Sequence, residues 1–314
     1  MRILFAGLLA ALALASPAEA DDTLRIAVGQ RGLWDTSVAE LGQRGGIFKK
    51  HGVVLDILYT QGGGETQQAV ISGSVELGSS AGVLGVFGAY AKGAPLRIIG
   101  AEMTGGGDLF WYVQTASPIR SLADTEGKTI AYSTNGASTH AIVNAFMRQY
   151  DLKAKPVATG SPAATLTQVM SGQVDVGWAG PPFGLDLIDQ GKIRIIASGN
   201  DASAFRNQTV RLLITNAATL AARRPAIERF MAAYRETIDW MYSDPAVFKH
   251  YSDFIGVSEA TGRRGRDGFY PKAALNPDTI VGADAINADA VAFKYMTAPL
   301  TREQLAELIQ IPPR

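Results

Sequence analysis

Two stretches of nine residues in this chain are nearly the same, and their positions limit the folds that the chain can adopt. Residues 70–78 read VISGSVELG and residues 169–177 read VMSGQVDVG, so Gly172 follows Gly73 by 99 positions (172 − 73 = 99). Each stretch is typical of a helix end, a turn with a left-handed glycine, and a strand with an acid between apolar residues. The repeat predicts two similar lobes.

Outside these stretches, short β-branched runs alternate with helical segments from residue 21 to about residue 200. This alternation is typical of βαβ units and of a largely parallel sheet. The predicted strands are residues 24–28, 53–59, 75–78, 96–101, 129–133, 156–158, 174–178 and 193–198. Ser37 and Glu40 form a capping box, which predicts a helix that ends near Gly52. Five helices are predicted near the C-terminus, at residues 225–243, 245–254, 258–269, 284–295 and 301–309.

Two segments bracket the middle of the chain and define its predicted topology. Residues 109–113 and 209–215 are the expected points at which the chain leaves a first lobe and returns to it. We therefore predict an α/β fold with two lobes, a hinge at the two crossovers and a ligand-binding cleft between the lobes. The predicted division is a signal peptide at 1–20, lobe 1 at 21–112, lobe 2 at 113–205, and the second part of lobe 1 with the C-terminal helices at 206–314.

The first 20 residues have the composition of a secretory signal peptide. Arg2 precedes an apolar run at residues 3–15, and an Ala-x-Ala sequence ends at Ala20, so we expect cleavage after Ala20 and a periplasmic location. The apolar run is shorter than the about 20 residues that span a membrane. Because the chain has no cysteine, it forms no disulfide and uses no thiol in catalysis.

Charge and motif content favour a binding protein over an enzyme. The 29 Lys and Arg residues balance 29 Asp and Glu residues, so the chain lacks the excess of positive charge that is typical of proteins that bind nucleic acid. The three histidines, His51, His140 and His250, lack metal-ligand spacing. The Gly127-Lys128-Thr129 motif lacks the spacing of a phosphate loop, and no Gly-x-Ser-x-Gly motif occurs. We therefore expect no catalytic residues, no metal and no cofactor.

Two predicted helix N-termini are candidate oxyanion sites. Ser79-Ser80 and residues 135–139 stand where free amides and the positive end of a helix dipole could hold an anion. Ordinary N-capping by the same side chains is the alternative. Among these loops Arg31 offers a cation, whereas Glu65 and Asp108 offer negative charge. These charges therefore do not require a strongly anionic ligand. If Glu65 faces the cleft and does not merely stabilise its helix, we expect a ligand with donors, such as a zwitterion or an aminopyrimidine.

Aromatic and basic residues allow further interpretations. Trp34 and Trp178 could stack on a ligand, and Trp178 is favoured by its place at a strand end. Phe110-Trp111-Tyr112 are expected in the core, because consecutive strand residues face opposite sides. The basic run at residues 262–266 is either a solvated surface or a docking site for a permease or an acidic partner.

Four motifs follow one another in the middle of the chain, and their order is informative. They are Gly127-Lys128-Thr129-Ile130-Ala131, Asn135-Gly136-Ala137-Ser138-Thr139-His140, Ser171-Gly172-Gln173-Val174-Asp175-Val176-Gly177-Trp178 and Pro182-Phe183. This order resembles the periplasmic solute-binding proteins of ABC importers that bind nitrate, sulfonates, taurine or thiamine-type pyrimidines. The resemblance covers nearly all of the mature chain and implies the two-lobed periplasmic binding protein fold of type II topology, with a helical C-terminal region.

The resemblance also implies a binding site and partners. In that family the ligand contacts loops at the strand ends of both lobes. Carried over by position, the implied ligand-binding residues are Gln30, Trp34, Gln61, Gly62, Ser79, Ser80, Thr104, Asn135, Ser138, Thr139 and Trp178. The implied partners are the permease and ATPase subunits of an ABC transporter in the inner membrane, and the implied state is a monomer.

The sequence as a whole is therefore interpreted as a periplasmic solute-binding protein without catalytic activity. It would capture a small polar or anionic organic solute of the sulfonate, nitrate-like or pyrimidine class and deliver it to a permease. Two alternatives stay open. One is an enzyme on the same fold, similar to a pyrimidine synthase, and the other is a ligand-sensing module for a membrane receptor.

Overall fold

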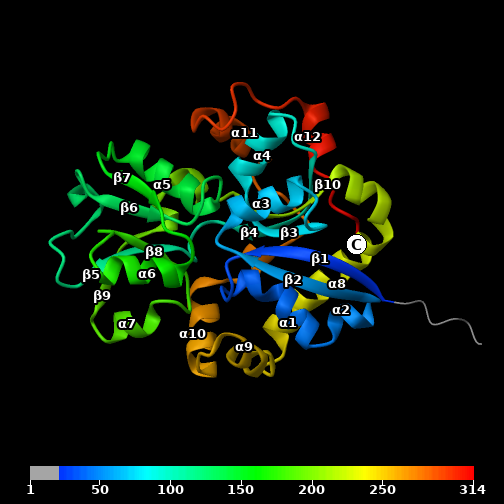
Figure 1. The fold of residues 1–314 in the computed structure, drawn as a ribbon, viewed down its shortest axis with the longest axis horizontal. Coiled ribbons are helices and arrows are strands. Elements are labelled where there is room, and N and C mark those ends of the chain that lie inside the picture. The colour runs from blue at the N-terminus through cyan, green and yellow to red at the C-terminus, as the bar shows by residue number, and fades with distance from the viewer. Residues whose placement is uncertain (1–20) are drawn as a thin grey trace, which may run out of the picture.

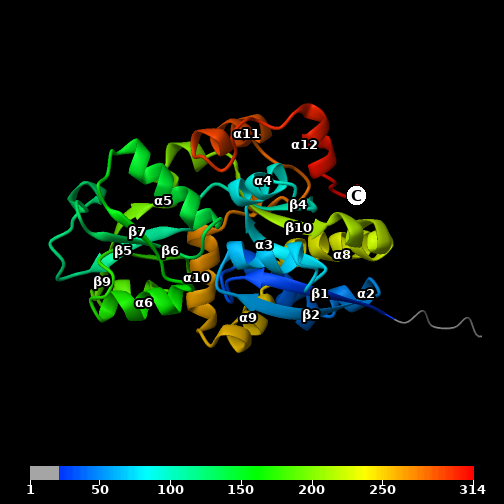
Figure 2. The same cartoon turned by 45° about the horizontal axis from the view of Figure 1, so that its top comes forward.

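The computed structural model describes residues 21–314, and the predicted signal peptide lies outside the described residues. Two α/β lobes lie side by side, and the chain passes from the first to the second and back (Figure 1). The C-terminal helices pack mainly on the first lobe, while α10 (Glu259–Phe269) lies next to the second lobe (Figure 2).

The first lobe is built on a five-stranded sheet with the spatial order β2-β1-β3-β10-β4. Its strands are β1 (Asp22–Gly29), β2 (Val53–Thr60), β3 (Leu77–Gly82), β4 (Leu96–Thr104) and β10 (Thr209–Asn216). Strand β1 is parallel to β2 and β3, whereas β10 is antiparallel to both β3 and β4. The carboxyl ends of β1 to β4 therefore meet at one edge of the sheet.

The second lobe repeats this strand order. Its strands are β5 (Phe110–Gln114), β6 (Thr129–Tyr132), β7 (Lys155–Ala158), β8 (Gly177–Ala179) and β9 (Ile193–Ser198). Sheets β8-β5-β9 and β6-β7 are joined by a bridge from Ile130 to Val176, which gives the order β7-β6-β8-β5-β9. Strands β5 and β10 take the antiparallel position in their sheets, so each lobe receives one strand directly from the crossover.

Helices cover the sheets and form the C-terminal region. Those between strands are α1 (Val38–Arg44), α2 (Ile47–Lys50), α3 (Gly63–Ile71), α4 (Val83–Ala91), α5 (Ser138–Gln149), α6 (Pro162–Met170) and α7 (Leu185–Asp189). Those after β10 are α8 (Ala217–Ser243), α9 (Val247–Ile255), α10, α11 (Ala283–Ala292) and α12 (Arg302–Leu308). Short 3-10 turns include η1 (Asp35–Ser37) and η5 (Lys272–Leu275). The predicted α/β class and helical C-terminal region are confirmed.

The repeated nonapeptide forms the same structure in both lobes. It joins α3 to β3 and α6 to β8, with left-handed φ angles of 73° at Gly73 and 76° at Gly172. Glu76 accepts a hydrogen bond from the backbone N–H of Arg25, and Asp175 accepts one from Thr129, both at 2.9 Å. The acid of each copy thus ties the repeat to the neighbouring strand, β1 in the first lobe and β6 in the second.

Two local predictions near the cleft were wrong. Ser37 does not form a capping box, because its hydroxyl donates to the carbonyl oxygen of Leu33 at 2.6 Å and the chain already turns in η1. Ser79-Ser80 do not begin a helix. They lie within β3, which pairing with β10 extends to Gly82, and α4 begins only at Val83.

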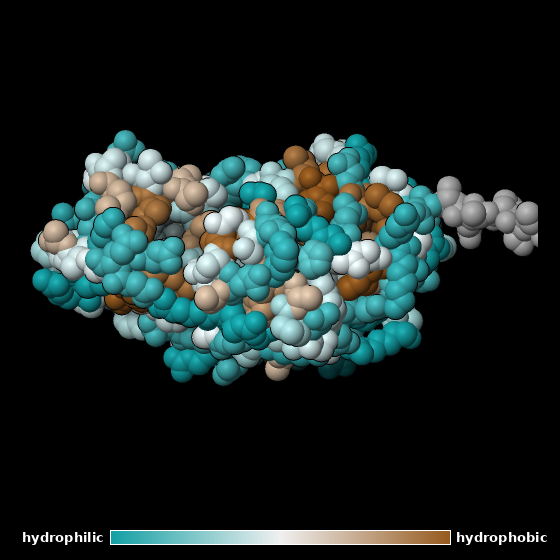
Figure 3. Space-filling model, turned by 90° about the horizontal axis from the view of Figure 1, so that it is seen from below, coloured by the Kyte–Doolittle hydropathy of each residue, from teal (hydrophilic) through white to brown (hydrophobic). Residues whose placement is uncertain are grey.

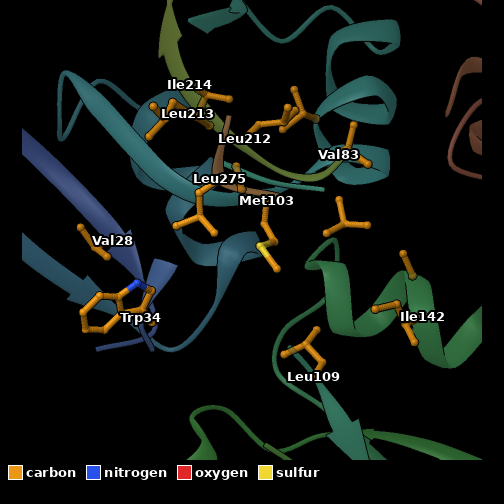
Figure 4. Packing of buried hydrophobic residues seen from close by; sticks show 14 of the residues in the cluster. Val28, Trp34, Val83, Met103, Leu109, Ile142, Leu212, Leu213, Ile214 and Leu275 are labelled. Carbon is orange, nitrogen blue, oxygen red and sulfur yellow. The ribbon is translucent and has the colours of Figure 1, made fainter. Parts of the chain in front are cut away.

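A continuous apolar core runs through both lobes. In Figure 4, Val28, Leu212 and Ile214 belong to the first sheet, whereas Leu109 precedes β5 and Ile142 lies on α5. The face of the molecule seen in Figure 3 is mostly polar, with scattered apolar patches. Among residues 21–314, no helix combines the length and apolar composition needed to cross a membrane.

Candidate functional site

A small cavity lies where the carboxyl ends of the first lobe's parallel strands meet the second lobe. Its volume is about 10 Å³, close to the space of one water molecule. The cavity is lined by Gln30, Leu33, Gly63, Ser80, Leu109, Ser133, Ala137, Ser138, Thr139, Trp178 and Arg211. Because both lobes supply walls, the two lobes are closed on each other. A larger hollow of about 560 Å³ lies elsewhere on the first lobe, beside Arg235 and Asp278.

Glycines of the first lobe allow this close approach. We call Gly62, Gly64, Gly82 and Gly85 the glycine seam, because each lies against the backbone or side chains of residues 133–138 in the second lobe. A Cβ atom at Gly64 or Gly82 would overlap a carbonyl oxygen of the second lobe. Across the seam, Gly64 N–H donates to Thr134 Oγ1 and Gln67 Nε2 donates to the Gly136 carbonyl, both at 3.1 Å.

Two helices begin at the cavity without a cap from the side chain of their own N-cap residue. The N-cap residues are Gly62 for α3 and Ala137 for α5, and neither has a side chain that accepts from the first-turn amides. The first residues of these helices, Gly63 and Ser138, line the cavity. The Gly64 amide in the first turn of α3 donates to Thr134 Oγ1 of the second lobe. The two positive dipole ends, one from each lobe, still favour an oxyanion between them.

Arg211, on β10, is a buried cation held between two buried acids. Its Nη2 donates to Asp108 at 2.5 Å, and its Nε lies 2.8 Å from Asp35 as an ion pair without hydrogen-bond geometry. All three side chains are at most 2 % exposed. Burial disfavours the charged form of Arg211, but Asp108 and Asp35 outweigh this effect and raise its pKa. Burial raises the pKa of Asp108 to about 6, against the influence of Arg211.

A third buried acid, Glu102 on β4, contacts the cavity wall from behind. One of its carboxyl oxygens accepts from the hydroxyl of Ser79 at 2.9 Å and from the backbone N–H of Ser80. Burial, together with the nearby Asp35, raises the pKa of Glu102 to about 8, although the bonds from Ser80 and Ser79 and the charge of Arg211 act the other way. Burial thus favours the protonated form of this carboxyl well above the usual pH range of a glutamate.

Besides Arg211, whose Nε forms an ion pair but no hydrogen bond, two lining residues carry buried polar atoms with no hydrogen-bond partner anywhere in residues 21–314. These atoms are Nε1 of Trp178, a donor, and Oε1 of Gln30, an acceptor. Buried polar groups are nearly always hydrogen-bonded, so unpaired ones at a cavity favour a role in binding. The amide nitrogen of Gln30 is already used, since it donates to the carbonyl oxygen of Gln61 at 2.6 Å.

Comparison with known proteins places the chain in a family. Residues 40–247, more than half of the chain, match the family model described as NMT1/THI5 like. The chain belongs to the NMT1/THI5-like family. The sequence-based recognition of this group of binding proteins is thereby confirmed.

Several similar proteins share the fold of this family member. The alkanesulfonate-binding protein SsuA from Xanthomonas axonopodis pv. citri, solved with MOPS, is similar with a TM-score of 0.77 and 21% identity over 94% of this chain and 100% of that one. The nitrate-binding protein NrtA from Synechocystis PCC 6803 gives a TM-score of 0.70 at 14% identity over 92% and 85% of the two chains.

One curated relative from Escherichia coli (strain K12) is described as an aliphatic sulfonates-binding protein. It is 29% identical over 141 residues, which is 44% of this chain and 44% of the relative. The aligned part is thus less than half of either protein.

In this NMT1/THI5-like chain, the eleven residues predicted to bind ligand fall into three groups. The cavity brings together Gln30, Ser80, Ser138, Thr139 and Trp178. Gly62 and Asn135 both belong to the contacts of the glycine seam, Gly62 against Ser133 and Thr134 and Asn135 against Gly64. Gln61 lies beside the seam, where its Oε1 accepts from Ser161 N–H of the second lobe at 3.3 Å. The other three predicted residues lie behind the cavity wall.

These three residues make contacts within the first lobe. Trp34 stacks on Phe248 with ring centroids 5.5 Å apart and belongs to the apolar core. Ser79 donates to Glu102, as described above, and Thr104 pairs with Thr209 at 3.4 Å. None of the three lines the described cavity.

Arg211, Asp35 and Glu102 were not predicted as site residues from the sequence. A lone arginine in the apolar strand TVRLLIT was the available signal, because a buried charge needs a partner. A glutamate within the apolar run of β4 was a similar signal. Their partners come from other strands and loops, so pairing could not be read from spacing alone.

Other residues considered from sequence have structural roles. Glu65 is exposed in the first turn of α3, where it accepts from Gln61 N–H at 2.9 Å. Arg31 donates to the carbonyl oxygen of Phe254. Within the basic run, Arg264 pairs with Asp189 of the second lobe, while Arg266 lies over the Phe248 ring. His140 accepts from Gly136 N–H at 3.2 Å and lies 3.0 Å from the Tyr295 hydroxyl.

Proposed function

We propose that this chain is a periplasmic solute-binding protein of an ABC importer, which closes two lobes around a small organic solute that carries an anionic, oxygen-rich group. The observation that carries the proposal is the composition of the interlobe cavity. Uncapped ends of α3 and α5, the unpaired indole N–H of Trp178 and the Arg211 side chain converge on it from both lobes. All of these groups are donors, and the indole N–H of Trp178 has no acceptor within residues 21–314, which suits an oxyanion.

The charges around the cavity favour a singly charged anion. Arg211 is already compensated by Asp35 and Asp108, so the region beneath the cavity offers no net positive charge. A monoanion held by helix dipoles and neutral donors is compatible with this arrangement, whereas a dianion would meet two buried carboxylates. Sulfonates meet this requirement, and the similar proteins that bind sulfonates support the choice.

Ligand entry requires the lobes to separate. A cavity of about 10 Å³ cannot admit an alkanesulfonate, so the solute would bind an open form and stabilise a closed one that has a wider cavity than this structure. The crossovers that lead into β5 and β10 are the places where a rotation would occur. The ligand would shift the population toward closure because it contacts both lobes only in that form.

The same proposal covers location, partners and mechanism. We propose secretion to the periplasm, a monomeric protein, and transfer of the unchanged solute to the permease and ATPase subunits. A receptor that senses the solute is the alternative partner.

No group of three or more metal-ligating side chains occurs within residues 21–314.

An enzyme is the second candidate, and one observation favours it. The desulfurization enzyme DSZB is similar in fold, with a TM-score of 0.62 at 16% identity over 90% of this chain. The two candidates differ in what happens to the ligand. Incubation with an alkanesulfonate, followed by mass spectrometry of the small-molecule fraction, should recover the sulfonate unchanged if the chain is a binding protein.

A thermal-shift panel tests the binding proposal. The secreted form, residues 21–314, would be unfolded and refolded to remove bound ligand, then heated with sulfonates, nitrate, small carboxylates, pyrimidines and sulfate. A ligand at about a hundredfold its Kd should add roughly 2.7 kcal/mol to the free energy of unfolding. We expect a shift with sulfonates and none with sulfate. A shift with sulfate but not with any sulfonate would contradict the proposed charge selection.

A further inference from the structure

Ser80 has an unfavourable backbone conformation at a place where it forms part of the cavity wall. Its φ angle is 66°, in the left-handed region that side chains with a Cβ disfavour. Gln30, another lining residue, has a φ angle of 81°. Such conformations persist only where surrounding contacts enforce them, and they gather at functional sites. The contacts that enforce the Ser80 conformation are therefore of functional interest.

Irregular strand pairing explains why Ser80 needs an external partner. The register between β10 and β3 passes from Ala81 directly to Gly78, so Ser79 and Ser80 fall in a bulge. The register between β10 and β4 passes from Met103 to Ala101, so Glu102 falls in a second bulge. Bulges re-aim side chains and leave backbone groups without ladder partners.

The two bulges meet through the Glu102 side chain. Its carboxyl oxygen accepts from the Ser80 N–H and from the Ser79 hydroxyl, across the intervening strand β10. The side chain is 1 % exposed and does not line the cavity. The carboxyl thus replaces the ladder partner that the Ser80 amide lacks.

The conformation of Ser80 also affects the start of helix α3. A Cβ atom at Gly63 would overlap the Ser80 carbonyl oxygen, so the two backbones are in direct contact. Gly63 is the first residue of α3 and lines the cavity. A change of φ at Ser80 would therefore move two parts of the wall together.

We infer that Glu102 is a positioning residue for ligand binding, which holds Ser80 in the left-handed conformation that shapes the cavity wall. It acts through Ser80 and does not touch the ligand. The inference rests on the proposed function for its effect on affinity, but the contact between Glu102 and Ser80 exists without any ligand. An experiment can therefore examine the contact between Glu102 and Ser80 separately from its effect on ligand affinity.

The test compares four variants with the wild type. Glu102→Met keeps the length of the side chain and removes the acceptor, whereas Glu102→Gln keeps an acceptor oxygen. Ser80→Gly removes the penalty of the left-handed conformation, and the fourth variant combines Glu102→Met with Ser80→Gly. The matched control is Glu76→Met, because Glu76 also accepts from a backbone N–H, that of Arg25, but lies away from the cavity.

The first readout is the dissociation constant for ethanesulfonate by calorimetry. We expect Glu102→Met to weaken binding about tenfold, and Glu102→Gln and Glu76→Met to stay within about threefold of the wild type. The combined variant should bind like Ser80→Gly alone, because glycine adopts a positive φ without help. A combined variant as weak as Glu102→Met would overturn the inference, since Glu102 would then act by general packing.

The second readout needs no ligand and separates this inference from the proposed function. Amide hydrogen exchange of Ser80 in the ligand-free protein should be about tenfold faster in Glu102→Met than in the wild type, and unchanged in Glu76→Met. If ethanesulfonate does not bind the wild type, this result alone supports the contact and the proposed ligand class is at fault. Unchanged exchange of Ser80 in Glu102→Met would overturn the inference whatever the ligand is.

Discussion

Gly64 of the first lobe packs against the carbonyl oxygen of Asn135 in the second lobe, with no room for a side chain between them. The amide N–H of the same glycine donates to Thr134 Oγ1 at 3.1 Å. If the lobes separate to admit a ligand, as proposed above, these contacts would have to break. We therefore propose that the glycine seam takes part in closure.

Replacement of Gly64 by alanine should separate closure from folding. Alanine favours α3, so the free energy of unfolding without ligand should stay the same or rise by up to about 1 kcal/mol. The added methyl group should oppose closure, so affinity for the ligand found in the panel should fall about tenfold or more. Gly268→Ala is the control, because this helical glycine has no atom within 4 Å of the added Cβ. Equal affinity in Gly64→Ala and Gly268→Ala would contradict the role of the seam.

Trp178 and Trp111 allow a paired test of the indole N–H. Nε1 of Trp178 has no partner within residues 21–314, whereas that of Trp111 donates to the Ala131 carbonyl at 2.9 Å. Trp178→Phe should weaken ligand binding about tenfold with little loss of stability, since hydrogen bonds to charged groups contribute about 1.5–3 kcal/mol. Trp111→Phe should instead lower the melting temperature and leave affinity nearly unchanged. Calorimetry measures the ligand affinity of both variants and thermal denaturation measures their stability. Equal loss of affinity in Trp178→Phe and Trp111→Phe would contradict a role of the Trp178 N–H in ligand binding.

Removal of Arg211 should destabilise the fold in a pH-dependent way. Arg211→Met leaves Asp35 and Asp108 buried without a counter-ion, which typically costs about 3–5 kcal/mol. The loss should be smaller at pH 5 than at pH 8, because the carboxyl of Asp108 can take up a proton. A second change, Asp108→Asn, should restore part of the stability. Urea unfolding at both pH values gives the comparison, and equal stability of Arg211→Met and wild type at pH 8 would contradict this account.

Glu102 should make stability fall as pH rises. Its pKa is about 8 in the folded protein, against a usual value of 4.5, so the folded chain binds more protons than the unfolded chain between these values. The free energy of unfolding therefore decreases through this window, by up to about 1.4 kcal/mol per pH unit. Asp108, with a pKa of about 6, acts in the same direction at lower pH. Between pH 6 and 8, Glu102→Gln should show a shallower slope in urea unfolding than the wild type, and an identical slope would argue against a protonated Glu102.

The sequence predicted those features of the fold that depend on local pattern. The nonapeptide repeat located α3-β3 and α6-β8, because the turn at Gly73 or Gly172 is encoded by neighbouring residues. The helix predicted at Ser79-Ser80 was wrong, because pairing with a strand from much later in the chain extends β3. Such pairing leaves no local signal in the sequence.

The candidate site was predictable only in part, for a related reason. Serines and threonines near helix starts can be recognised from sequence, and Ser138 and Thr139 do line the cavity. The group formed by Asp35, Asp108 and Arg211 depends on three distant segments that meet at one sheet edge. Two bulges bring Glu102 to Ser80, and bulges follow from packing of whole strands.

The most direct measurement is small-angle X-ray scattering of residues 21–314 with and without the sulfonate that gives the largest thermal shift. The account predicts a smaller radius of gyration for the wild type with ligand, and little or no change for Gly64→Ala at the same ligand concentration. A wild-type protein that binds the sulfonate, by calorimetry on the same sample, without any change in radius of gyration would contradict closure of the two lobes around the ligand.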